Sequence, residues 1–225
     1  MIADPRYNRQ ANIVPQELIE SQEIVVIGVG AVGREVVRTL ACNGAKNITM
    51  YDYDTVELHN CTTQGYHESD VGRPKVDCTK EEVLRINSNI NIDAINDRWR
   101  PRKDKTFKAA FFCVDSLPMR EKLFNWFKDS AEFICDARVG GEQIQLLSAS
   151  DDESREHYPK TIGKEENAFE DGCHIPMVKH SANIAASMLV QQYIQWLRGS
   201  DIYHDRVFSL MCSELTVRET KQKVE

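Results

Sequence analysis

The chain lacks the features of several protein classes. It has seven cysteines, but no two of them form a Cys-x-x-Cys pair, so we expect no structural zinc on paired cysteines. Because they are scattered and odd in number, a reduced compartment fits better than a disulfide framework. The most apolar late stretch, 181–190, is too short to span a bilayer. The first residues show no basic segment followed by an apolar one, so we expect no signal peptide and a cytoplasmic protein.

Positive charge is also in short supply. The chain has 28 Lys and Arg against 35 Asp and Glu, a formal net charge of −7, with an isoelectric point near 5.5. This balance disfavours nucleic acid and anionic membranes as main partners, and says little about a protein partner. The 225 residues, 41% of them hydrophobic, suffice for one α/β domain over residues 1–225.

Strand and helix patterns alternate along most of the chain, which predicts a Rossmann-like, mostly parallel sheet flanked by helices. Strands are expected near residues 23–28, 47–51, 91–95, 108–114 and 132–136, and helices near 31–43, 74–87, 117–129 and 181–198. Two later apolar segments predict a C-terminal antiparallel extension, near 143–150 and 207–212. The charged segment 151–173 has little periodicity and predicts a long crossover loop.

A glycine-rich turn follows the first predicted strand, in the run Ile24-Val-Val-Ile-Gly28-Val-Gly30-Ala-Val-Gly33. Gly28 permits a tight turn, Gly30 lets a phosphate approach the backbone, and Gly33 lets helix and strand pack closely. The amides at the start of the next helix would hold the phosphate. Asp52 ends the second strand, at the spacing where a carboxylate meets a ribose hydroxyl. The pattern therefore predicts a nucleotide site.

The residues that follow favour ATP over NAD. Asp54, Asn60, Gln64 and Lys75 come after Asp52, and a further carboxylate, Asp115, closes the apolar run 109–114. A lysine offsets phosphate charge and a carboxylate binds a hard cation, so together they suit ATP with magnesium. An NAD-dependent oxidoreductase stays an alternative; it would explain the glycines and Asp52 but leave the lysine and the second carboxylate without a role.

Five motifs together resemble the ThiF/MoeB family, adenylyltransferases related to ubiquitin-activating enzymes. They are Arg6-Tyr-Asn-Arg9-Gln10, the glycine turn, Asp52-Tyr-Asp-Thr-Val-Glu-Leu-His-Asn60, Gly72-Arg-Pro-Lys75 and Val114-Asp115-Ser-Leu-Pro-Met-Arg120. The resemblance covers about residues 6–199 in the family's order. It implies ATP-dependent adenylation of the C-terminal glycine of a ubiquitin-like or sulfur-carrier protein ending in Gly-Gly. A small carboxylate or the carboxyl terminus of a short peptide is also open as the acceptor.

The resemblance also implies roles for individual residues. Asp115 matches the magnesium carboxylate, and Asn60 and Lys75 are expected near the phosphates. Arg9 matches an arginine that reaches into the partner subunit's ATP site, which implies a homodimer. Cys173 matches a cysteine that in some relatives attacks the activated carrier; it can equally be an ordinary cysteine at a loop end.

One position departs from the family pattern. The family usually has an arginine three residues after the asparagine, whereas this chain has Thr63 there. Loss of a guanidinium beside the transferring phosphates removes transition-state stabilisation, unless Arg73, Lys75 or Arg9 replaces it. A catalytically weak binding module with the same fold is therefore a second hypothesis.

Overall fold

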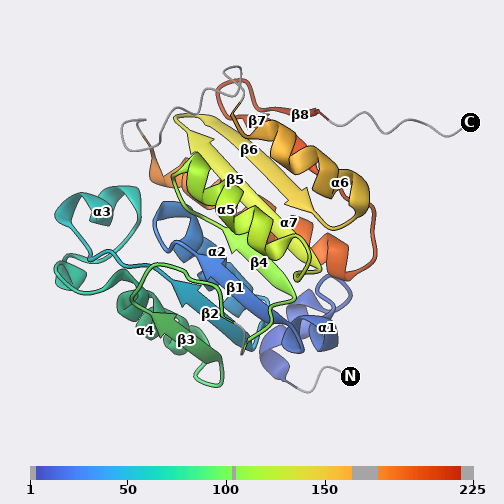
Figure 1. Cartoon of the computed structure of the whole chain (residues 1–225). Coiled ribbons are helices and arrows are strands. Elements are labelled where there is room, and N and C mark those ends of the chain that lie inside the picture. Colours follow the sequence, from blue (N-terminus) through green and yellow to red (C-terminus); the bar gives the residue numbers. More distant parts are fainter. Residues whose placement is uncertain (1–3, 103–104, 164–176, 219–225) are drawn as a thin grey trace, which may run out of the picture.

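A computed structural model describes residues 4–102, 105–163 and 177–218. Its eight-stranded sheet has the order β3-β2-β1-β4-β5-β6-β7-β8 (Figure 1). The strands are β1 (Glu23–Ile27), β2 (Asn47–Tyr51), β3 (Asn91–Ile95), β4 (Ala109–Phe112), β5 (Phe133–Gly140), β6 (Gln143–Ala149), β7 (Asp205–Ser209) and β8 (Glu214–Val217). Strands β1 to β5 pair in parallel and β6 to β8 antiparallel, which confirms the predicted fold class.

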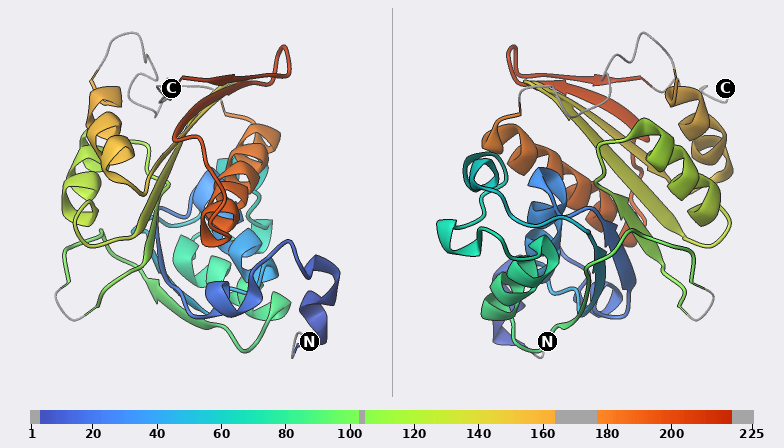
Figure 2. Two further views of the ribbon diagram at one scale, coloured as in Figure 1. Left: turned by 90° about the vertical axis from the view of Figure 1, so that its right-hand side faces the viewer. Right: turned by 60° about the vertical axis from the view of Figure 1, so that its left-hand side comes forward.

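Helices cover both faces of the sheet (Figure 2). The α-helices are α1 (Gln16–Glu20), α2 (Ala31–Cys42), α3 (Leu58–Thr63), α4 (Lys75–Ile86), α5 (Leu117–Phe127), α6 (Asp152–His157) and α7 (Lys179–Leu197). The 3-10 helices are η1 (Pro5–Gln10), η2 (Glu68–Asp70) and η3 (Tyr158–Thr161). One face carries α2, α4 and α7, and the other carries α5 and α6. None of the helices in the described ranges is both long and apolar enough to cross a bilayer.

Side chains of β1 alternate between two apolar cores. Ile24 and Val26 join the larger core under α2 and α7, whereas Val25 and Ile27 join the smaller core under α5. Because both faces are covered, the strand is apolar throughout, as is typical of parallel strands in α/β proteins.

The prediction of one long loop over 151–173 is wrong in its first half. Residues 152–161 form α6 and η3. Asp151 caps α6, since its Oδ1 accepts the Ser154 amide at 2.8 Å, while the Ser154 Oγ accepts the Asp151 amide at 3.1 Å. This reciprocal capping stabilises a helix that is too short to show periodicity. Residues 164–173 lie outside the described ranges.

The last predicted strand is also shifted. The apolar pattern placed it at 207–212, but β7 begins at Asp205, and β8 was not predicted. Asp205 is buried because its carboxylate accepts hydrogen bonds from Gln145 at 3.1 Å and pairs with His157 at 3.0 Å. Strand β8 is exposed along its length, so no burial pattern marks it in the sequence.

Candidate functional site

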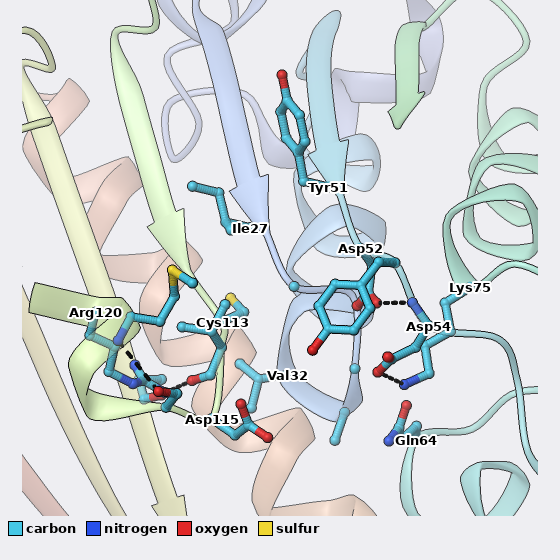
Figure 3. Close-up of a pocket in the computed structure, with 18 of the residues that line it drawn as sticks. Ile27, Val32, Tyr51, Asp52, Asp54, Gln64, Lys75, Cys113, Asp115 and Arg120 are labelled. Atoms are coloured by element: carbon cyan, nitrogen blue, oxygen red, sulfur yellow. Dashed lines mark hydrogen bonds and ion pairs between the residues drawn. The ribbon is translucent and has the colours of Figure 1, made fainter. Parts of the chain in front are cut away.

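A cavity of about 620 Å³ opens at the carboxyl ends of β1, β2 and β4 (Figure 3). The chain runs from β1 to β2 and β3 on one side of β1 and then returns to β4 on its other side, so the strand order reverses at β1. Open parallel sheets bind ligands at this switch point. The cavity lining includes Gly28, Gly30, Asp52, Asp54, Thr63, Gln64, Lys75 and Asp115, which come from five separate stretches of the sequence.

The glycine turn is closely packed at two of its three glycines. Gly28 has φ +88°, and a Cβ there would lie 2.5 Å from the Cys113 carbonyl oxygen. A Cβ on Gly33 would lie 1.8 Å from the Gly28 oxygen. At Gly30 nothing would approach closer than the Gln64 Oε1, at 3.7 Å, and Gly30 lines the cavity. Of the three glycines, Gly30 alone leaves open space where a Cβ would stand.

Gly33→Ala is expected to destabilise the protein by about 3 kcal/mol, since the new methyl would push α2 away from β1. For a domain of this size, that lowers the melting temperature by roughly 6–12 °C. Gly30→Ala is the control for this measurement and should lower the melting temperature much less. Equal melting temperatures for the two variants would contradict the packing argument.

Asp52 ties the glycine turn to the end of β2. Its Oδ2 accepts the Val29 amide at 2.7 Å and its Oδ1 accepts the Asp54 amide at 2.9 Å. Burial raises the pKa of the Asp52 carboxyl, and the two amide hydrogen bonds partly offset this. Each oxygen keeps a further lone pair, which a ribose hydroxyl can use. The ribose role stays a prediction.

Lys75 is buried, with 6% of its surface exposed, at the start of α4. Its Nζ lies 3.0 Å from the Asp54 Oδ2, and its amide donates to the Asp54 carbonyl oxygen at 3.0 Å. An antiparallel bridge between Thr55 and Pro74 joins the same two segments. The segment after β2 and the helix start thus hold the ammonium group at the cavity wall (Figure 3).

Asp115 lines the cavity in the segment that follows β4. Buried Arg120 fixes this segment, because it donates to the carbonyl oxygens of Phe112 at 3.4 Å and Ala137 at 3.1 Å, and also to that of Val114. Arg120 also forms an ion pair with Asp136. Burial lowers the pKa of Arg120 to about 10, so it stays charged at neutral pH.

The side chains around the cavity suit a metal cation that takes most of its ligands from the substrate and from water. No group of three or more His, Cys, Asp or Glu side chains forms a metal site within the described ranges. Magnesium commonly uses one or two carboxylates together with phosphate oxygens and water. Asp115 offers such a carboxylate beside the glycine turn, and its role as a magnesium ligand stays a prediction.

Two other predicted residues lie away from the cavity of their own chain. Asn60 is buried and does not line the cavity; its Oδ1 caps α3 by accepting the Glu57 amide at 2.9 Å. Arg9 is exposed on η1, and the neighbouring Gln10 donates to the Cys42 carbonyl oxygen at the far end of α2. Arg9 is therefore remote from the site of its own chain. Cys173 lies outside the described residues.

Lys179, the first residue of α7, contacts two residues on the other elements around the cavity. Its Nζ donates to the Glu35 Oε1 at 2.6 Å and to the Gln64 carbonyl oxygen at 3.0 Å. Burial lowers the pKa of Lys179, and the bond to Glu35 opposes this. These contacts join α2 and α7 to Gln64, whose side chain lies next to Gly30. Because Gln64 lines the cavity, the contacts position one of its walls.

Three residues that line the cavity were not predicted from the sequence. Arg98 and Trp99 come from the connection between β3 and β4, and Arg138 comes from β5. The Arg98 guanidinium lies over the Tyr53 ring, 4.6 Å from its centre. Arg138 is buried, with its Nε 3.1 Å from the Asp136 Oδ2 and its Nη1 bonded to the Thr161 carbonyl oxygen. The position of Arg98 just after β3 is a signal that could have identified it.

Comparison with known proteins gives relatives over about half of the chain. Molybdopterin-synthase adenylyltransferase of Escherichia coli is 35% identical over 128 residues, which cover 52% of this chain and 51% of that protein. The Haemophilus influenzae enzyme of the same name is 31% identical and covers 52% and 53%. SUMO-activating enzyme subunit 2 of Dictyostelium discoideum is 34% identical over 102 residues, 45% of this chain and 15% of that protein. The matched part of the chain thus spans about half the length of the two adenylyltransferases.

Solved structures share the fold over nearly the whole chain. Escherichia coli MccB with ATP superimposes with a TM-score of 0.72 at 19% identity, covering 96% of this chain and 72% of that one. MccB with AMPCPP and MccA gives a TM-score of 0.73 at 19% identity, covering 97% and 72%. The sequence pattern of the ThiF family matches residues 7–223. The chain therefore belongs to the ThiF family.

Proposed function

We propose that this protein uses ATP to adenylate the C-terminal carboxylate of a ubiquitin-like or sulfur-carrier protein that ends in Gly-Gly. The observation that carries the proposal is the cavity itself, which brings Lys75 and Asp115 to the glycine turn at the switch point of the sheet. The names of the relatives, molybdopterin-synthase adenylyltransferase and SUMO-activating enzyme, support the same reaction class.

The chemistry requires charge stabilisation rather than a protein nucleophile. An oxygen of the acceptor carboxylate attacks the α-phosphorus of ATP, the bond to the bridging oxygen breaks, and pyrophosphate leaves with that electron pair. Lys75 would offset the charge on the phosphates, and the free amides at the start of α2 would donate hydrogen bonds to them. Magnesium, when held by Asp115 and the phosphates, neutralises further charge. Most of the acceleration then comes from positioning and electrostatics.

The threonine at position 63 supports a second function, a binding module that holds ATP without efficient transfer. Thr63 lines the cavity, and its hydroxyl donates to the His59 carbonyl oxygen at 2.9 Å. Unlike an arginine, this threonine places no positive charge beside the phosphates. A protein of this kind would bind ATP but exchange pyrophosphate slowly. Transfer of the activated acceptor to Cys173, as a step after adenylation, stays a prediction.

ATP with magnesium is expected to raise the melting temperature, and NAD is not. The reason is that Lys75 and Asp115 suit a triphosphate with a cation, and ligand binding to the folded state stabilises it by mass action. A thermal-shift titration with each nucleotide, at equal concentration, measures the difference. An equal response to NAD would favour the oxidoreductase alternative over adenylation.

We also propose a homodimer in which Arg9 of one chain serves the site of the other. Support comes from the position of Arg9, which is exposed and at the opposite end of the sheet from the site of its own chain. From this position Arg9 can contribute only to the site of a second copy of the chain.

Mixing Arg9→Ala with Lys75→Ala protein should restore part of the exchange activity that each variant lacks alone. A mixed dimer contains one site with both residues intact, so up to about a quarter of wild-type activity is expected from statistical mixing. Verified mixed dimers without recovery would contradict a shared site, and a monomer in light scattering would do so as well.

A further inference from the structure

Helix α3 turns one face toward the nucleotide cavity. His59, Thr63 and the C-cap residue Gln64 line the cavity, whereas the residues between His59 and Thr63 do not. The spacing of four residues places His59 and Thr63 one turn apart, and the Thr63 hydroxyl donates to the His59 carbonyl oxygen at 2.9 Å. The Gln64 Oε1 lies 3.7 Å from the point where a Cβ on Gly30 would stand. This face of α3 therefore borders the predicted phosphate position at Gly30.

The imidazole of His59 is accessible and has one nitrogen to spare. Its side chain is 69% exposed, and its Nδ1 lies 3.5 Å from the Glu57 Oε2. Among the described residues, none forms a hydrogen bond with the Nε2 of the ring. The Glu57 carboxylate favours a proton on Nδ1, so Nε2 carries a proton only when the ring is positively charged. Only the charged ring can then donate from Nε2 to a phosphate oxygen.

Other basic side chains do not replace the missing guanidinium at position 63. Arg73, one of the predicted replacements, forms ion pairs with two carboxylates and is not part of the cavity lining. Arg120 and Arg138 line the cavity but are buried and bonded to backbone carbonyl oxygens. Arg98 lies over a tyrosine ring in the connection after β3. His59 is the one basic residue that α3 brings to the cavity.

We infer that protonated His59 supplies the positive charge that Thr63 does not, by donating from Nε2 to an outer phosphate of ATP and to the departing pyrophosphate. This inference rests on the proposed function, because it assumes ATP as the substrate. A histidine changes its charge between about pH 5 and 8. The stabilisation is therefore present at low pH and is lost as the pH rises.

Other charged groups also face this end of the cavity. They come from α3 itself, the segment after β2, α2, α4 and α7, and are Glu57, Asp54, Arg34, Glu35, Lys75 and Lys179. Figure 3 shows Asp54 and Lys75 on the same side of the cavity as Gln64. Asp52 also lines the cavity, and burial raises the pKa of its carboxyl. Because these groups are common to the wild type and a His59 variant, the ratio of the two rates isolates the contribution of His59.

The first test is the exchange of pyrophosphate into ATP by wild type and His59→Gln as the pH is varied. Glutamine keeps a hydrogen-bonding side chain of similar length but has no charge. Wild type should be about tenfold faster at about pH 5.5, and the ratio should approach one at about pH 8.5. A ratio that stays the same at every pH, whether one or ten, would overturn the inference.

A second substitution tests whether charge at this face is what matters. Thr63→Arg in the His59→Gln protein should restore exchange, and the rate relative to wild type should then rise with pH because a guanidinium stays charged. Thr62→Arg is the matched control, since Thr62 is exposed and does not line the cavity. It should not restore exchange. Equal recovery with the two arginines would overturn the inference.

Calorimetry separates this inference from the proposed function. At about pH 5.5, His59→Gln should bind ATP with magnesium about tenfold more weakly than wild type, while AMP, which lacks the outer phosphates, should bind both equally. Equal ATP affinity, or equal weakening for AMP, would overturn the inference and leave the proposed function intact. If wild type binds ATP but exchanges no pyrophosphate, the proposed function fails, and the ATP affinities still decide whether His59 contacts the phosphates. Failure of wild type to bind ATP would overturn both.

Discussion

Replacing Lys75 by methionine is expected to lower ATP–pyrophosphate exchange by about 10²–10³-fold, the range seen when one preorganised charge-stabilising group is removed. Lys75 is buried and its Nζ is held 3.0 Å from Asp54, so its ammonium group is already in place before ATP binds. Methionine keeps most of the aliphatic stem, so the packing of α4 should survive. The measurement is the initial exchange rate at saturating ATP, acceptor and magnesium.

Lys80 provides a matched control on the same helix. It lies outside the cavity, so Lys80→Met should retain the wild-type exchange rate. If Lys75→Met exchanges pyrophosphate as fast as Lys80→Met, then Lys75 does not act on the phosphates. In that case its role is confined to the contact with Asp54.

Asp115→Asn is expected to reduce exchange by at least 10²-fold and to shift the magnesium dependence to much higher concentration. An amide oxygen is a weaker ligand for a hard cation than a carboxylate, and the change keeps the size of the side chain. Because Arg120 fixes the surrounding segment through backbone carbonyl groups, the fold should not change. The exchange rate is measured against the concentration of magnesium chloride.

Asp97→Asn is the control for Asp115→Asn. Asp97 lines the same cavity from the segment after β3, and its carboxylate pairs with Arg100. It should leave the magnesium dependence near that of wild type. An unaltered magnesium curve for Asp115→Asn would remove the basis for assigning the cation to this residue.

The fold was largely predictable because its main signals are repeated along the chain. Buried parallel strands are apolar throughout, and the helices between them have the expected lengths. Helices α1, α3 and α6 and strand β8 were not predicted, and two of these show why. Helix α6 depends on a local capping pair, Asp151 and Ser154, rather than on periodicity. Strand β8 is an exposed edge, so its side chains show no alternation between core and solvent.

The candidate site was partly predictable for a geometric reason. The carboxyl ends of neighbouring parallel strands meet at one edge, so Gly28, Asp52 and Asp115 had to lie close together. Tertiary contacts between distant segments cannot be predicted from the order of the strands. Arg138 reaches the cavity from β5 through its bonds to Asp136 and Thr161.

The position of Asn60 depends on a local contact rather than on contacts between distant segments. A local contact decides it, because the side chain bonds to the Glu57 amide three residues earlier and caps α3. Its predicted position near the phosphates came from motif order, which does not show such a competing backbone contact.

Exchange of radiolabelled pyrophosphate into ATP, in the presence of candidate carrier proteins ending in Gly-Gly, measures adenylation of the carrier itself. We predict magnesium-dependent exchange that requires the terminal glycine of the carrier, since its carboxylate is the attacking group, and that falls at least a hundredfold in Lys75→Met. A protein that binds ATP with magnesium but supports no exchange with any carrier would contradict adenylation of a carrier and would leave the binding module as the better account.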